Sequence, residues 1–469
     1  MTSLANAALP AELWINIISF MDREDLISAT FVSQQFLCIA QSHLFSRVEI
    51  PISFSPDDIW NTSYEFKVQN VLDRINFLST TDRISKAVKH LVVVNPMFDY
   101  DPEAASTLML LDKIFNVILP FCNLMSFSGH GLTIAGEHMR RLLSSPHLIS
   151  LVLSSCSIDT TSNHKQQCFD DAFPPLCSAF RELRLRATSN RHQSSAVGWW
   201  ASFISHSTTK TLEFSTGPDS DYMLHLLSLS HSPSMAALHS LTLTKLTSTT
   251  IAEFITTLTH CPSLGSLAIS DYDQSVDVLE QTISQSPNAA PVLEYAIVPY
   301  CLARPLARYR GLRHISVMHN DSRFISAEET HSLFEALYEG SSRSTLQSFI
   351  FTSEKITTET IPLFFTKFPN LRDGSIRVIR DDFPSTDNVL SFLSTAEFPR
   401  SLRRLHVVDV RPPLPERDLA RSYPDVVVRL DQVCPQLHAL MIATKTIRIR
   451  WSTRRRYVHT TSKGDLGLL

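Results

Sequence analysis

The sequence has little glycine, no paired-cysteine motif and no long apolar run, and each shortage argues against a class of protein. Its 469 residues include 11 glycines, about 2 percent against the roughly 7 percent usual in proteins, which disfavours glycine-cradled phosphate chemistry. None of the eight cysteines forms a C-x-x-C pair, and the N-terminus lacks the layout of a secretory signal. The apolar runs are too short to cross a membrane. We therefore expect a soluble protein of a reducing compartment.

Neither sign of charge is in large excess. The chain carries 42 basic and 46 acidic side chains, for a net charge of −4, which indicates neither a nucleic-acid binder nor a polyacidic protein. Residues 440–469 are the exception, with seven Lys or Arg against Asp465. We interpret residues 446–469 as a basic C-terminal tail, and we expect no nucleic-acid partner because aromatic residues are sparse there.

Motifs that would indicate an enzyme are also missing. The patterns G-x-x-x-x-G-K-[ST], G-x-S-x-G and H-E-x-x-H do not occur. Gly129, Gly131 and Gly136 follow an expected strand, but the third glycine is five residues after the second rather than three, so we interpret this segment as a turn. Histidines and cysteines show no ligand spacing. We expect no catalytic residue, metal, cofactor or small-molecule substrate.

The first fifty residues predict three short helices. Pro10 and Glu12 suit the start of the first helix, the acidic run from Asp22 to Asp25 suits the cap of the second, and Ser33 can cap the third. Such short helices carry more apolar surface than they can bury among themselves. A partner surface is therefore implied.

This segment resembles an F-box. The matching motifs, in order, are Leu9-Pro10-Ala11-Glu12-Leu13, Ile17-Ile18, Asp25-Leu26, Val32-Ser33-Gln34-Gln35-Phe36, Ala40 and Leu44-Phe45. The resemblance implies docking onto the Skp-type adaptor of a cullin-RING ubiquitin ligase. The residues it assigns to adaptor binding are Leu9, Pro10, Leu13, Ile17, Ile18, Leu26, Val32, Phe36, Leu44 and Phe45. An ordinary three-helix cap on the following domain is the alternative.

Further along the chain an apolar L-x-x-L-x-L pattern recurs at intervals of roughly 25–35 residues, a period typical of long leucine-rich repeats. Amphipathic segments separate the copies, so each unit predicts a helix, a turn and a strand. The first positions are Val88, Leu124, Leu148, Phe180, Thr209, Leu238, Leu264, Leu293, Leu312, Leu346, Leu371, Leu402 and Leu437. Proline often lies two residues before the first position, where we expect it to end the helix and favour extended backbone. The Cys-Pro-x-Leu form at Cys261 and Cys434 is similar to repeats of F-box proteins of the leucine-rich-repeat class.

These patterns predict an α/β chain in four parts. We expect an F-box with three helices at residues 1–50, a linker with connecting helices at 51–86, an irregular leucine-rich-repeat solenoid at 87–445, and the tail at 446–469. The solenoid would carry short parallel strands on a concave face and helices on a convex face. A doubly wound α/β domain is the alternative, but polar residues between the strand leucines argue against strands buried on both faces.

The resemblance implies a non-catalytic substrate-recognition subunit of an SCF-type ubiquitin ligase, located in the cytoplasm or nucleus, with a protein substrate on the strand face. The candidate substrate contacts are Arg184, Arg186, Glu213, Thr242, Thr244, Ser316, Arg404 and His406. A repeat scaffold outside any ubiquitin ligase is the main alternative. A hydrolase or nucleotide enzyme in the α/β region is a third hypothesis.

Overall fold

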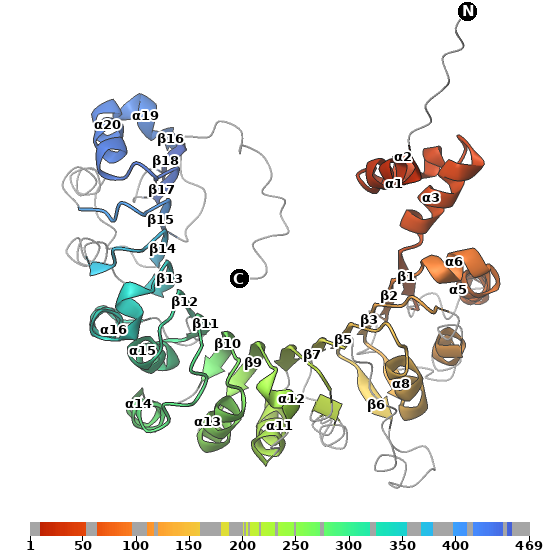
Figure 1. Ribbon diagram of the computed structural model, residues 1–469, viewed down its shortest axis with the longest axis horizontal. Coiled ribbons are helices and arrows are strands. Elements are labelled where there is room, and N and C mark those ends of the chain that lie inside the picture. The colour runs from red at the N-terminus through yellow and green to blue at the C-terminus, as the bar shows by residue number, and fades with distance from the viewer. Residues whose placement is uncertain are drawn as a thin grey trace, which may run out of the picture. The chain divides into compact units, whose positions relative to one another are not determined.

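The computed structural model describes residues 10–52, 63–95, 110–116, 121–159, 180–186, 200, 203–204, 207–214, 217–229, 233–247, 250–272, 276–318, 325–353, 367–378, 397–409, 416–443 and 448–452. The chain divides into two compact units, Met1–Leu238 and His239–Leu469. Each unit is of mixed α/β type with a long run of parallel strands (Figure 1).

The first unit begins with the three predicted helices, α1 (Ala11–Ser19), α2 (Arg23–Ala29) and α3 (Gln34–Leu44). The Asp22 side chain accepts a hydrogen bond from the Asp25 N–H at 2.8 Å, and Ser33 Oγ accepts one from the Phe36 N–H at 3.2 Å. Both caps are of the kind that polar side chains make at helix N-termini. The helices enclose a small core of Ile18, Leu26, Ala29, Ile39 and Ala40.

The sheet of the first unit follows directly. Its strand order is β1-β2-β3-β5-β7-β8, all parallel, and β4 and β6 form a separate pair. The strands are β1 (Arg47–Pro51), β2 (His90–Val94), β3 (Ser126–His130), β4 (Thr133–Ala135), β5 (Ser150–Ser154), β6 (Ser157–Asp159), β7 (Glu182–Arg186) and β8 (Thr211–Phe214). The helices between and after them are α5 (Ser63–Thr80), α6 (Asp82–Ala87), α8 (Gly136–Leu143), α11 (Gly217–Leu229) and α12 (Pro233–Ala236).

The second unit repeats the same alternation. Its strand order is β9-β10-β11-β12-β13-β14-β15-β17-β18-β16, parallel except for the antiparallel pair β17–β18. The strands are β9 (Ser240–Leu246), β10 (Ser266–Tyr272), β11 (Tyr295–Pro299), β12 (His314–Met318), β13 (Ser348–Ser353), β14 (Asp373–Val378), β15 (Arg404–Asp409), β16 (Glu416–Asp418), β17 (Ala439–Ala443) and β18 (Arg448–Ser452). The helices are α13 (Ile251–His260), α14 (Val276–Ser284), α15 (Tyr300–Tyr309), α16 (Ala327–Glu339), the 3-10 helix η2 (Ser341–Ser344), α19 (Leu419–Ser422) and α20 (Pro424–Val433).

Every predicted copy of the apolar pattern has a strand at its expected place, and the first position of each copy is buried. A shared hydrogen-bond motif sets the register between neighbouring copies. The N–H groups of Met125 and Ser126 both donate to the Lys89 carbonyl, and those of Ile149 and Ser150 both donate to Met125. The same pairing links Arg313 and His314 to Glu294 in the second unit. Backbone bonds at the start of these strands thus align each strand with the next.

The prolines before the strands lie in turns. The Leu264 N–H donates to the Cys261 carbonyl at 3.0 Å, which places Pro262 second in the turn, and Leu437 and Cys434 form the same bond at 2.9 Å. Proline suits this position because its ring fixes the backbone angle that the turn needs. The helices α13 and α20 end at His260 and Val433, one residue before the Cys-Pro pair, and the strands β10 and β17 begin four residues after the proline.

Only one face of each sheet is fully covered in the part of the chain that the structure describes. Side chains along the strands alternate between buried and partly exposed, as in β5, β7 and β12. Apart from α1–α3, the helices of each unit lie on one side of its strands (Figure 1). This one-sided cover differs from a doubly wound domain, in which helices bury both faces.

The strands extend beyond the predicted 87–445 span at both ends. β1 pairs with β2 inside the segment expected to close the F-box and open the linker. β18 pairs with β17 and β16 inside the segment expected to be a tail. Both strands carry alternating apolar residues, Val48 with Ile50 and Ile449 with Trp451, which suits a half-covered sheet.

Candidate functional site

Apolar side chains lie exposed on and between the first three helices. Leu13 and Ile17 on α1 are 46% and 43% exposed. Beyond the ends of α1 and α2, Phe20, Phe31 and Val32 are 90%, 84% and 68% exposed. Such a cluster of large apolar residues on one small module marks a surface for another protein.

The ten residues assigned to adaptor binding fall into three groups. Pro10, Leu13, Ile17 and Val32 are exposed, whereas Phe36, Leu44 and Phe45 are partly buried. Ile18 and Leu26 are buried in the three-helix core, where their side chains hold the helices together instead of facing outward. Leu9 lies outside the described residues.

Several exposed apolar residues were not part of the predicted set, namely Ile15, Phe20, Ile27 and Phe31. Phe20 and Phe31 each stand just after the last residue of a helix, away from the face that builds the core. A large apolar residue just beyond the end of a predicted helix could have indicated an exposed contact residue. Trp14, in contrast, packs on Phe36 with ring centroids 4.7 Å apart and supports the core.

The first-unit candidates on the strand face form one ionic network. Arg186 bonds both carboxylate oxygens of Glu213, at 2.7 and 3.1 Å. Arg184 bonds Glu182 at 2.6 Å and lies 3.7 Å from Glu213. The hydrogen bond that Arg186 donates to Glu213 raises the pKa of Arg186 although burial opposes this effect. Burial works to raise the pKa of Glu182, but hydrogen bonds from Ser150 and Arg184 and the charges of both arginines outweigh burial and lower it.

In the second unit Thr242, Thr244, Ser316 and His406 are partly exposed between the buried strand residues, and Arg404 is exposed. Arg404 Nε donates to Asp373 Oδ1 at 2.6 Å, and this bond raises the pKa of Arg404. These five residues lie in the second unit and the other three in the first, so the structure does not gather the eight candidates into one cluster within a single unit.

Two neighbours on the same face of the second unit were missed. Tyr295 and His314 pair in register, and their rings stack with centroids 5.9 Å apart. Burial lowers the pKa of His314 although the charge of Asp373 opposes this effect. Their place between the strand leucines was readable from the same pattern that marked Ser316.

The described residues offer little for catalysis or for a metal. They contain no group of three His, Cys, Asp or Glu able to hold a metal ion. Burial raises the pKa of the thiols of Cys156, Cys261, Cys301 and Cys434 to about 12, which leaves them protonated. Gly131 has a φ of 65° within the turn between β3 and β4, so the glycine-containing segment there is a turn. Cys168 and Cys177 lie outside the described residues.

Within the described part of the chain, no helix is both long and apolar enough to span a membrane. A search of curated proteins gave no match to the chain. The F-box domain family matches residues 7–47, which include all three N-terminal helices. F-box proteins are in general non-catalytic adaptors. The chain therefore carries an F-box domain, which implies an adaptor role in SCF-type ubiquitin ligase complexes.

Proposed function

We propose that this chain is the substrate-recognition subunit of an SCF-type cullin-RING ubiquitin ligase. The observation that carries the proposal is the F-box at residues 7–47 with large apolar side chains exposed on its helices. The F-box binds a Skp-type adaptor, and the open strand face binds a protein substrate. Such complexes act in the cytoplasm and nucleus, and we place the chain there.

The exposed apolar residues are the docking contacts in this proposal. Leu13, Ile17 and Val32 supply the contact area, together with Phe20 and Phe31. Burying one such side chain stabilises a complex by about 1.5–3 kcal/mol, so a few of them suffice for a firm interface. Ile18 and Leu26 support this surface from within the module.

The region after the F-box is, in this proposal, a divergent leucine-rich-repeat solenoid. Support comes from the buried L-x-x-L-x-L positions, the proline turns before β10 and β17, and the one-sided helices. β1 and β18 add strands at either end of the predicted span. A repeat array of this kind offers its strand face as a binding surface.

The charged residues on that face favour a substrate held by shape and polar contacts. Arg184 and Arg186 are already paired with Glu182 and Glu213, so the four charges cancel. Thr242, Thr244, Ser316 and His406 carry hydrogen-bonding groups of the kind that bind a polypeptide. We therefore assign substrate contact to the strand face as a whole, without a single dominant ion pair.

The mechanism is proximity. A substrate held on the strand face stays close to the ubiquitin-conjugating subunit that the adaptor brings. Holding two groups on one assembly raises their effective concentration, to the order of millimolar for short flexible links. No catalytic group on this chain is then required.

Proximity labelling in cells tests the ligase role. We expect labelled proteins that accumulate when the proteasome is inhibited, and we expect their ubiquitination to fall when Leu13→Asp replaces the wild type. Val292→Asp is the matched control, because Val292 is an exposed apolar residue of the second unit. Equal ubiquitination with all three chains would instead support a scaffold outside any ligase.

Cross-linking tests the substrate surface. Cross-links from a captured substrate should map to residues between the strand leucines, such as Thr242, Ser316 and His406, more often than to α13, α14 or α16. A map dominated by these helices would contradict the assignment.

A further inference from the structure

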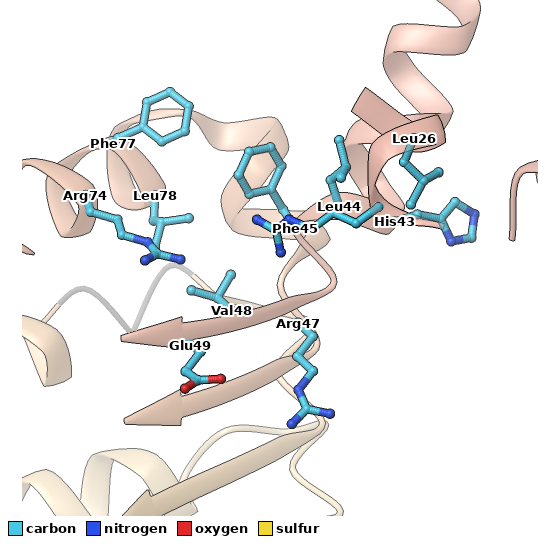
Figure 2. Close-up of a pocket in the computed structure, with 11 residues that line it drawn as sticks. Leu26, His43, Leu44, Phe45, Arg47, Val48, Glu49, Arg74, Phe77 and Leu78 are labelled. Carbon is cyan, nitrogen blue, oxygen red and sulfur yellow. The ribbon is translucent and has the colours of Figure 1, made fainter. Parts of the chain in front are cut away.

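A pocket of about 520 Å³ opens between the F-box and the first strand. Its lining comes from α2, α3, the residues after α3, β1 and α5 (Figure 2). This volume is within the range of sites that hold small ligands or anchoring side chains of a peptide.

The described lining of the pocket combines apolar side chains with an excess of positive charge. Its apolar part consists of Leu26, Leu44, Phe45, Val48, Phe77 and Leu78. The Phe45 and Phe77 rings lie 6.1 Å apart between centroids, and Phe77 is 49% exposed, so the aromatic wall is accessible.

Three arginines from three different elements line the same pocket: Arg23, Arg47 and Arg74. Among the described residues, no carboxylate lies within ion-pair distance of any of them. Glu49 is the only carboxylate of the described lining, so within that lining the arginines exceed the carboxylates by two charges. Guanidinium groups in such a setting favour a carboxylate-bearing ligand.

The pocket also lies along an open sheet edge. Among the strands that the structure describes, β1 is last in the order and pairs with β2 alone. The His90 N–H donates to Ser46 and the Ile52 N–H donates to Val94, so the even-numbered residues of β1 point their backbone groups toward β2. The backbone groups of Arg47, Glu49 and Pro51 therefore point away from β2. Proline at an outward position costs the ladder no bond, as is typical of edge strands.

Figure 2 shows which side of β1 the pocket occupies. Arg74 and Leu78 lie on the side of β1 that Val48 faces, whereas the side chains of Arg47 and Glu49 lie on the other side. The outer edge of β1 therefore runs between an apolar lining on one face and a guanidinium group on the other.

We propose that this pocket binds an extended acidic segment of a partner protein, which adds a strand to the outer edge of β1. Backbone bonds to Arg47 and Glu49 hold the segment, as in other complexes that extend a sheet at its edge. Alternate side chains of a strand point to opposite faces, so apolar residues of the segment reach Val48 and Phe77 on one face while its carboxylates meet Arg47 on the other. The apolar lining and the free backbone edge favour a peptide over a nucleic acid or a lipid surface, whose phosphates match neither.

Fluorescence anisotropy with the full chain tests the charge and the apolar contacts. The probe is a synthetic eight-residue peptide in which Asp or Glu alternates with Val. Arg47→Glu should weaken its binding by about tenfold or more, and Glu49→Gln should strengthen it. Arg403→Glu, at an exposed arginine of the second unit, should leave the affinity unchanged. Equal affinity for wild type and Arg47→Glu would overturn the proposal.

N-methylated peptides test the strand addition. One probe carries N-methyl groups on its odd residues and a second on its even residues, because only one set can face β1. We expect one probe to bind like the parent and the other to lose binding. Loss or retention of binding with both probes would overturn the edge pairing. The proposal does not rest on the adaptor role, since Leu13→Asp should leave peptide affinity unchanged.

Discussion

Arg186 on β7 holds Glu213 on β8 through two hydrogen bonds, from Nε to Oε1 at 2.7 Å and from Nη2 to Oε2 at 3.1 Å. The two side chains come from neighbouring parallel strands, and Arg184 lies opposite Glu213 in the register. A planar guanidinium matches a carboxylate in this two-bond geometry, which an ammonium group cannot reproduce. The pair therefore adds a side-chain link between β7 and β8 on the open face of the first unit.

Arg186→Lys should lower the stability of the first unit slightly. The lysine keeps the charge but loses the two-bond geometry, and the pair is about one-third exposed on the arginine side, so we expect a loss of about 0.5–1 kcal/mol. Urea unfolding followed by hydrogen exchange of β7 and β8 measures it. Arg181→Lys, at an exposed neighbour, is the control. Equal losses at both positions would show that the pairing with Glu213 contributes nothing.

The F-box core and its outer surface should respond differently to truncation. Ile18 is fully buried, so Ile18→Ala should lower the local unfolding free energy of α1–α3 by about 2–5 kcal/mol. Leu13→Ala, on the same helix but 46% exposed, should cost under about 1 kcal/mol. Native-state hydrogen exchange of the α1–α3 amides gives both values. A similar loss for the two variants would contradict the placement of Ile18.

Acid should destabilise the second unit through His314. Burial holds its pKa below the ordinary 6.5 in the folded state, so below about pH 6.5 the unfolded chain binds more protons at this residue than the folded chain. The preference of the folded state for a neutral His314 therefore costs no stability above about pH 6.5. Below that pH the folded chain loses stability as the pH falls toward the pKa of folded His314. His314→Gln should therefore show a smaller drop in Tm between about pH 7.5 and about pH 5.5 than the wild type. His147→Gln, at an exposed histidine, should behave like the wild type.

Thiol reactivity should follow burial. Cys122 is exposed, whereas Cys261 and Cys434 are buried with pKa values raised to about 12. Because the thiolate is the reactive form, an alkylating reagent at about pH 8 should modify Cys122 first and leave the other two unmodified until the protein unfolds. Mass spectrometry of peptides from the labelled native protein reads this out. Early modification of Cys261 would contradict the packing of its turn.

The strands could be predicted because each copy of L-x-x-L-x-L places its apolar residues on one face of an extended chain. Ile315 and Val317 on β12, and Leu405 and Val407 on β15, follow that spacing. β1 carries the same alternation at Val48 and Ile50. The sequence analysis assigned those residues to the end of the F-box and the start of the linker, so β1 was not predicted.

The division between core and surface in the F-box could not be read from periodicity. The first helix is apolar on several sides, with Leu13, Trp14, Ile17 and Ile18 all in range of a helical stripe. Packing against α2 and α3 selects Ile18 for the core and leaves Leu13 and Ile17 exposed. The arginine pocket was equally hidden, because Arg23, Arg47 and Arg74 are far apart in sequence and only the fold brings them together.

Calorimetric titration of a purified Skp-type adaptor into the full chain tests the central claim most directly. We expect the wild type and Val292→Asp to bind alike, and we expect Leu13→Asp and Ile17→Asp each to abolish binding, because a carboxylate cannot be buried unpaired in an apolar interface. Hydrogen exchange of β9–β12 should be the same in all four proteins, which shows that the strands remain folded. Undiminished adaptor binding by both Leu13→Asp and Ile17→Asp would contradict the account.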